Sequence, residues 1–341
     1  MRVLPVDASA LSTATPAALP IAAPRRESSI RMKKHPLNYV GYPAPLSVAE
    51  ARARGATDYD IRSTRRFLPA SWGIRFDDDS STRFPVPTWA DDKWVEEAQL
   101  LLAMSHRHPG IVACRETAAR LYGWPLPRAL DDATLHLGSA DPNKRIRRSG
   151  IALHRLRNLS TVEWLKLPVL HPLPTFAQLA PLCSVTSLVQ IGDAAVGDWK
   201  TPPQFSLTSL NEYVSDTKYL RSRSKLEAAA ELIREDVDSP METDLRLWLI
   251  ARGLPEPIVH PAVYCPTTNL TLHPDLGYPE QMLALEYEGD FHRISEDQWA
   301  TDIDRVNALR AAGWTVIRVA KWTDRRQLER DIRLHLGLNP K

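Results

Sequence analysis

The chain has 341 residues and a formal net charge of +2, with 43% hydrophobic and 25% charged residues. That length exceeds one typical core and predicts two or three domains of an ordinary soluble globular protein. No apolar run approaches the ~20 residues of a membrane span, which argues against membrane association. The three cysteines are far apart and include no CxxC pair. They argue against a disulfide framework and a zinc site, and they favour a reducing cytoplasm.

The first 44 residues are rich in Pro, Ala and Ser and are expected to be disordered. Residues 45–80 predict a small winged-helix-like module. In this module Ser47 caps a helix over 48–54, a second helix covers 59–66, and a strand covers 72–76. Three arginines would lie on the DNA-facing side of the second helix: Arg62, Arg65 and Arg66. The alternative is an ordinary pair of short helices that carries surface arginines.

Residues 85–205 mix helical and β-like segments and predict a compact α+β domain. Its densest basic run, NKRIRR, contains Lys144, Arg145, Arg147 and Arg148. Such a run suits contacts with nucleic-acid phosphates, and a solvated loop is the alternative reading. Residues 206–238 predict a polar helical connector that is broken near 221–224.

The remaining residues, 239–341, form the most regular part of the sequence. A helix from Pro240 to Gly253 precedes three strands at 258–265, 270–276 and 282–288, and the last two strands should form a hairpin. A helix at 298–312, a strand at 314–319 and a helix at 324–336 follow. The fold class is therefore α/β, or more closely multi-domain α+β, and the C-terminal αβββαβ core contains a mixed central sheet.

Acidic residues gather in this C-terminal part. Glu286 and Glu288 are two residues apart on one strand and so share a face. The hairpin would bring Asp275 beside them, and Glu242 near the start of the first helix could reach the same place. Mg²⁺ prefers such oxygen ligands. Each residue also has a structural reading: Glu242 in a capping box with Ser239, Asp275 at a turn, and the glutamates on an edge strand.

The order of these segments resembles the PD-(D/E)xK nuclease superfamily. Pro274-Asp275 is followed by Glu286-Tyr287-Glu288 in the (D/E)-x-K position. The segments SPMETDLRLWL, PDLGYPEQMLALEYEGDFHR and DIDRVNALRAAGWTVIRV resemble a bacterial domain of unknown function related to very-short-patch repair endonucleases, with a restriction-endonuclease-like core. Upstream, CRETAARLYGWPLP and the winged-helix-like module resemble AbiEi-type antitoxins and transcriptional regulators.

The first resemblance implies a metal site for Mg²⁺ or Mn²⁺. Asp275, Glu286 and the backbone carbonyl of Tyr287 would hold the metal, and Glu242 would bind it directly or through water. The metal would activate a water for attack on a phosphodiester. The sequence departs from the family pattern at Glu288, which stands where lysine is usual. His292 and Arg305 are the candidates to support the transition state, although His292 also fits a local polar contact.

Two functions follow from these resemblances. The first is a metal-dependent DNA endonuclease acting in DNA repair or in defence against foreign DNA. The second is a DNA-binding regulator or antitoxin whose nuclease-like domain is degenerate. DNA is the partner in both. Cleavage of two strands would call for a homodimer, and the antitoxin resemblance would add a partner toxin or defence-system protein.

Overall fold

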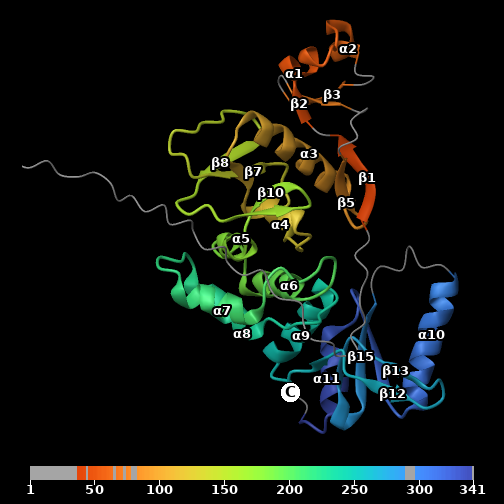
Figure 1. Ribbon diagram of the computed structural model, residues 1–341. Coiled ribbons are helices and arrows are strands. Elements are labelled where there is room, and N and C mark those ends of the chain that lie inside the picture. Colours follow the sequence, from red (N-terminus) through yellow and green to blue (C-terminus); the bar gives the residue numbers. More distant parts are fainter. Residues whose placement is uncertain are drawn as a thin grey trace, which may run out of the picture.

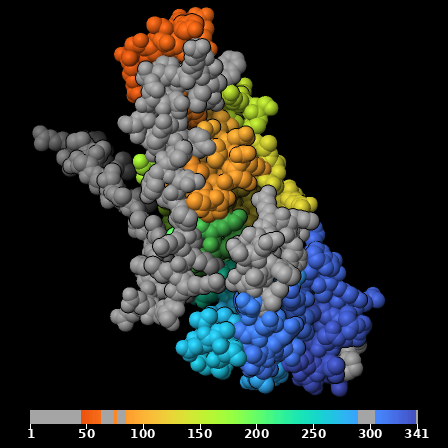
Figure 2. Space-filling model, turned by 90° about the vertical axis from the view of Figure 1, so that its right-hand side faces the viewer, coloured from red at the N-terminus to blue at the C-terminus, as the bar shows by residue number. Residues whose placement is uncertain are grey.

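The computed structural model describes residues 37–43, 45–63, 67–71, 74–77, 83–288 and 296–339. Within these ranges helices and strands are mixed, so the predicted α+β class is confirmed. Figures 1 and 2 show the N-terminal elements at one end of the molecule and the C-terminal elements at the opposite end. The described residues contain no helix long and apolar enough to cross a membrane.

The N-terminal elements comprise two short helices and a three-stranded sheet. Their bounds are β2 (Pro45–Ser47), α1 (Val48–Ala53), α2 (Asp58–Ser63), β3 (Phe67–Ser71) and β4 (Ile74–Asp77), with strand order β2-β4-β3. The predicted cap is confirmed, because Ser47 Oγ accepts from the Glu50 amide at 3.1 Å and the Ser47 amide donates to Glu50 at 2.6 Å. Helix α2 is described as far as Ser63, so the predicted helical residues 64–66 lie outside the described residues, and β3 was not predicted.

A separate two-stranded sheet joins this end to the rest of the chain. Strand β1 (Leu37–Pro43) pairs antiparallel with β5 (Arg83–Pro87). The expected disorder of residues 1–44 is therefore wrong for residues 37–43. Residues 1–36 and residue 44 lie outside the described residues. A strand with weak local signals still forms when a distant edge satisfies its backbone hydrogen bonds.

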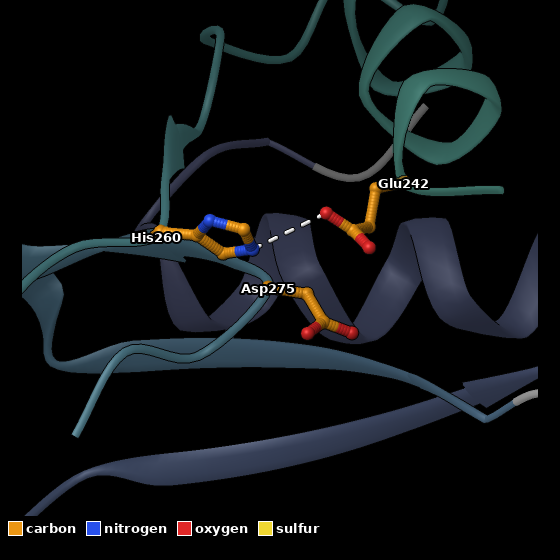
Figure 3. Close-up of side chains that lie close together, drawn as sticks. All are labelled: Glu242, His260 and Asp275. Atoms are coloured by element: carbon orange, nitrogen blue, oxygen red, sulfur yellow. Dashed lines mark ion pairs between the residues drawn. The ribbon is translucent and has the colours of Figure 1, made fainter. Parts of the chain in front are cut away.

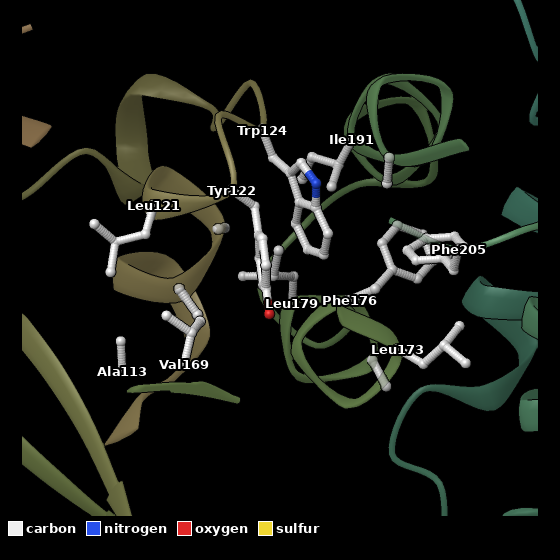
Figure 4. Packing of buried hydrophobic residues seen from close by; sticks show 14 of the residues in the cluster. Ala113, Leu121, Tyr122, Trp124, Val169, Leu173, Phe176, Leu179, Ile191 and Phe205 are labelled. Atoms are coloured by element: carbon white, nitrogen blue, oxygen red, sulfur yellow. The ribbon is translucent and has the colours of Figure 1, made fainter. Parts of the chain in front are cut away.

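The middle of the chain builds a five-stranded mixed sheet covered by helices. Its strand order is β8-β7-β6-β10-β9. Its elements are α3 (Asp92–Arg107), β6 (Ile111–Ala113), α4 (Arg115–Leu121), η1 (Arg128–Leu130), β7 (Leu135–Ser139), β8 (Ile151–Arg155), β9 (Thr161–Trp164), β10 (Leu167–Leu170), α5 (Pro172–Leu179) and α6 (Val185–Val196). An aromatic group anchors the core: Tyr122 stacks on Trp124, whose ring meets Phe176 and Phe205 edge-on (Figure 4).

Two further helices, α7 (Leu207–Asp216) and α8 (Arg223–Leu232), occupy the predicted connector. The break between them, at residues 217–222, overlaps the predicted break near 221–224 only at residues 221 and 222. They do not stand apart as a linker, however, because Leu210, Leu226 and Ile233 are fully buried in the same core as the middle sheet. Each of these helices has apolar residues at helical spacing, which form one apolar face, and that face packs against the middle unit.

The C-terminal unit has a four-stranded mixed sheet in the order β11-β14-β15-β16. Its elements are α9 (Pro240–Ala251), β11 (Ile258–Val259), β12 (Val263–Cys265), β13 (Leu270–Leu272), β14 (Leu276–Tyr278), η2 (Pro279–Gln281), β15 (Leu283–Glu288), α10 (Glu296–Ala311), β16 (Thr315–Ala320) and α11 (Arg325–His335). The predicted hairpin is confirmed, since β14 pairs antiparallel with β15. Strand β15 is central, because β16 pairs with its other edge in parallel. The edge-strand reading of its glutamates is therefore wrong.

Two predicted strands are each divided in two. The segment 258–265 forms β11 in the main sheet and β12 in a separate ribbon with β13, and the segment 270–276 forms β13 and β14. A proline lies at each division, Pro261 after His260 and Pro274 after His273. Proline has no amide hydrogen to donate to a ladder, and His260 has φ +45°, so the chain turns at these points.

Helices cover both faces of the C-terminal sheet. Leu245 and Leu249 of α9 and Ile332 of α11 pack on one face against Leu283 and Leu285 of β15. Helix α10 covers the other face, where its Ala308 and Leu309 pack with the β12–β13 ribbon. Successive side chains of β15 alternate between these faces, so Glu286 and Glu288 lie on the α10 side.

A buried ion pair joins the C-terminal unit to the middle unit. Asp193 of α6 is 1% exposed and contacts Arg246 of α9 at 3.0 Å, and the Arg246 side chain is fully buried. Thr243 of α9 donates to the same Asp193 oxygen at 2.7 Å. Arg246 also contacts Glu256 at 3.0 Å. Helix α9 is therefore held against α6 by polar contacts that have little access to water (Figure 1).

We expect Arg246→Met to destabilise the protein by about 3–5 kcal/mol, because it leaves the Asp193 carboxylate buried without its cation. Urea unfolding followed by circular dichroism measures this change. The matched control is Arg326→Met, which replaces an exposed arginine of α11 and should change stability by less than about 0.5 kcal/mol. Equal midpoints for the two variants would contradict the role assigned to the pair.

Candidate metal centre

Three side chains from three elements meet beside the C-terminal sheet: Glu242, His260 and Asp275 (Figure 3). One possible ligand atom from each lies within 4.8 Å of the other two. Glu242 comes from the first turn of α9, His260 follows β11, and Asp275 immediately precedes β14. The pairing of β11 with β14 brings the last two together, and the His260 amide donates to the Asp275 carbonyl at 3.1 Å.

Glu242 is held by the start of its own helix. Ser239 caps α9 by accepting from the Glu242 amide at 3.2 Å, which is one of the two bonds of the predicted capping box. The Glu242 carboxylate accepts from the Ser239 hydroxyl at 2.8 Å and from the Asp238 amide at 3.1 Å. The side chain is nevertheless turned toward His260, whose Nε2 lies 3.3 Å from Oε2. The capping role and membership of the cluster therefore coexist.

Asp275 is the most perturbed carboxyl of the group. Its Oδ2 accepts from the Tyr287 amide at 2.7 Å. Burial raises the pKa of the Asp275 carboxyl to about 6, and the nearby Glu242 carboxylate acts in the same direction. The Tyr287 amide and the charges of Arg305 and His260 oppose this rise without cancelling it. Asp275 is therefore in an environment that disfavours its negative charge.

His260 was missed by the sequence analysis. A single histidine before a proline carries no ligand spacing, and only the β11–β14 pairing places it next to Asp275. Burial by itself would lower the pKa of His260. The hydrogen bond with Glu242 and the surrounding carboxylates outweigh that effect and raise the pKa above its usual value.

Glu286 lies next to this cluster without being one of its three members. Leu276 pairs with Leu285, so the same register sets Asp275 opposite Glu286 across the hairpin. The Glu286 side chain is 12% exposed, and its Oε1 lies 3.2 Å from Arg305 Nη2. Arg305 of α10 also donates to the His273 carbonyl at 2.5 Å. The predicted proximity of Arg305 to the acidic strand is therefore observed.

Glu288 does not join the other carboxylates. It forms an ion pair with Arg318 of the neighbouring strand β16. Arg318 pairs in register with Glu286, so the arginine and both glutamates share one face of the sheet. The expected convergence of four acids is thus reduced to Glu242 and Asp275 with Glu286 adjacent. Tyr287 contributes its amide to Asp275 as described, and its ring packs on the opposite face. His292 lies outside the described residues.

The predicted DNA-contact residues lie in the other two units. Arg62 is exposed on α2 and contacts Asp58 at 3.7 Å, whereas Arg65 and Arg66 lie outside the described residues. The basic run of the middle unit forms the connection between β7 and β8. Three of its members line a cavity, namely Lys144, Arg145 and Arg147, and Arg148 is exposed beside them.

Comparison with known proteins gives few relatives. No protein-family model matches the chain. Two uncharacterised proteins of Mycobacterium tuberculosis, MT2308 and Rv2248, are each 26% identical to it over 222 residues, which cover 61% of this chain and 73% of theirs. Among solved structures, the RV2827C protein of Mycobacterium tuberculosis is similar, with a TM-score of 0.35 and 16% identity over 67% of this chain and 86% of that one.

Asp275→Asn should stabilise the metal-free protein, increasingly as the pH rises. The folded-state pKa of about 6 is above the ordinary value of 3.8, so ionisation of Asp275 costs stability as the pH rises from about 4 through 6. Asparagine avoids this cost and can still accept from the Tyr287 amide. We expect a gain on the order of 2–3 kcal/mol at pH 7.5 and little gain at pH 4.5.

Thermal unfolding in the presence of a chelator at both pH values measures this gain. Asp331→Asn is the control, because Asp331 is an exposed carboxylate of α11 whose hydrogen bond from Gln327 an asparagine also keeps. Its stability relative to the unsubstituted protein should be the same at both pH values. A pH-independent difference for Asp275→Asn would show that its carboxyl titrates normally.

Proposed function

We propose that this protein is a metal-dependent DNA endonuclease whose catalytic centre is built on Glu242, Asp275 and Glu286. The observation that carries the proposal is the approach of the Glu242 and Asp275 carboxylates to each other beside the central strand that bears Glu286. Two nearby negative charges with little access to water repel each other, and a bound divalent cation would remove that cost. The order of the motif residues along the chain supports the same proposal.

The chemistry of the donor atoms fits a small divalent cation. Glu242 and Asp275 offer carboxylate oxygens, which suit Mg²⁺ and Mn²⁺. His260 offers an imidazole nitrogen, which is a better ligand for Mn²⁺ than for Mg²⁺ and can bind only when neutral. When bound, the cation would lower the pKa of a coordinated water and neutralise charge on the scissile phosphate.

Two arginines would complete the site. Arg305 is 3.2 Å from Glu286 and would hold this carboxylate in place until DNA enters, when its guanidinium can contact a phosphate oxygen. Arg318 pairs with Glu288, the residue at the usual lysine position. The positive charge that lysine provides in the family would then come from the neighbouring strand, and Glu288 would keep Arg318 oriented.

Incubation with supercoiled plasmid and Mn²⁺ or Mg²⁺ should produce nicked or linear DNA. We expect Asp275→Asn and Glu286→Gln to lower the rate at least about 100-fold, because each removes a carboxylate that would help to hold the cation. Glu280→Gln changes an exposed carboxylate of η2 in the same unit and should leave the rate unchanged. Intact plasmid with every cation tested, from a protein with a normal unfolding transition, would refute the endonuclease.

A DNA-binding regulator with a non-cleaving nuclease-like unit is the second candidate. The ion pairs of Glu286 with Arg305 and of Glu288 with Arg318 favour it, because paired carboxylates are stable without a metal. The N-terminal pair of helices with its exposed Arg62 would then contact DNA.

Selection of bound fragments from genomic DNA, followed by footprinting, tests this candidate. A regulator should protect one sequence, and Arg62→Gln should weaken that protection about tenfold by removing a phosphate contact. Arg128→Gln replaces an exposed arginine of the middle unit and should have no effect on the footprint. Binding without preference for any sequence would contradict the regulator.

A further inference from the structure

In Figure 1, strands β7 and β8 of the middle unit lie away from the C-terminal sheet. A basic cavity of about 340 Å³ is formed by these two strands and the connection between them. Four cationic side chains line it, namely Lys144, Arg145, Arg147 and Arg155, together with His154 and one carboxylate, Asp141. A volume of this order accommodates a small ligand or one nucleotide.

Among the described residues, no carboxylate forms an ion pair with the cations of this cavity. Lys144 donates to the Pro109 carbonyl, and both Arg145 and Arg155 donate to the Pro142 carbonyl, at 2.7 and 2.6 Å for the two arginines. The lining carboxylate Asp141 accepts from the Asn143 amide at 2.8 Å, which keeps it within its own turn. These backbone contacts hold the cationic groups in place without cancelling their charge, so the cavity has a surplus of positive charge.

His154 gives the cavity a second feature. Its Nε2 is 2.9 Å from Nδ1 of His136, a buried residue of β7, and the planes of the two rings differ by 17°. Behind them, His136 Nε2 lies 3.6 Å from Glu116, and Glu116 in turn contacts Arg115 at 3.2 Å. Burial lowers the pKa of both histidines, that of His154 to about 4, so both rings are neutral at pH 7.

The chain of contacts assigns a role to each ring nitrogen. The Glu116 carboxylate favours a proton on His136 Nε2, so His136 Nδ1 accepts and His154 Nε2 donates. Nδ1 of His154 is then a hydrogen-bond acceptor. Because both rings are neutral, the positive charge of the cavity comes from its lysine and arginine side chains alone.

We propose that this cavity binds a phosphate monoester, as found at the end of a nucleic-acid strand or in a mononucleotide. The arginine and lysine side chains would bind the charged oxygens. A phosphate monoester carries nearly two negative charges at pH 7 and a phosphodiester carries one, so the site should prefer a terminal phosphate over an internal one. The proposal does not depend on DNA cleavage, because it concerns another unit of the protein and requires no metal.

Binding of fluorescently labelled DNA oligonucleotides to the full chain, with a chelator present, tests the preference. Two oligonucleotides of one sequence are compared at physiological salt, one with a 5′-phosphate and one with a 5′-hydroxyl. We expect the phosphorylated strand to bind about tenfold more tightly, the value of one good charge-assisted hydrogen bond. Competition with adenosine 5′-monophosphate and with inorganic phosphate separates a strand-end site from a mononucleotide site.

Variants of the cavity identify where the preference arises. Arg147→Gln and Arg155→Gln should each remove most of it, because each removes one of the cations that line the cavity. Arg157→Gln is the matched control: Arg157 is an exposed arginine just beyond β8 and does not line the cavity. It should weaken both oligonucleotides equally and leave their ratio unchanged.

Two results would overturn the proposal. Equal affinity for the two oligonucleotides would show a general electrostatic surface only. A preference that persists in both Arg147→Gln and Arg155→Gln, with unchanged unfolding transitions, would place the phosphate site elsewhere. Loss of plasmid cleavage in the Asp275 or Glu286 variants leaves this measurement unaffected, so the two proposals fail independently.

Discussion

The buried carboxylate of Asp193 is the contact on which the arrangement of the two larger units depends. It lies on α6 of the middle unit, and it accepts from the Arg234 amide, from Thr243 and from Arg246. Thr243 and Arg246 belong to α9, so satisfying one desolvated charge sets both the position and the rotation of that helix. Unpaired, the same charge would cost several kcal/mol in this setting. Glu242 precedes Thr243 in the chain, and its place beside His260 follows from this docking.

Charge compensation distinguishes the acidic groups of the C-terminal unit. Glu286 meets Arg305, Glu288 meets Arg318, and Glu242 meets His260. Within the described residues Asp275 is stabilised by the Tyr287 amide and by more distant charges, and its pKa remains raised. A cation entering the cluster would therefore gain most from Asp275. The middle unit shows the opposite case, an excess of positive charge. Lys144, Arg145 and Arg155 donate to backbone carbonyls, which carry no formal charge, so these side chains suit the binding of an anion.

Local patterns predicted much of the C-terminal unit because each of its signals acts within a few residues. The capping serine before α9, the hairpin that ends in β15, and the two-residue spacing of Glu286 and Glu288 all appear as the sequence indicated. The errors arose where distant segments decide. Residues 37–43 became a strand only because β5 supplies an edge, and the helices of the predicted connector were absorbed into the middle core.

By itself, the sequence determined which carboxylates could share a face and which helix would present Glu242, because side-chain periodicity and capping are local properties of the backbone. The tertiary structure alone decided which of these groups meet. His260 entered the cluster through the pairing of β11 with β14, and Glu288 left it because β16 set Arg318 beside it. Electrostatic partners are chosen by proximity in space, and strand pairing brings together residues whose separation along the chain carries no signal of the contact.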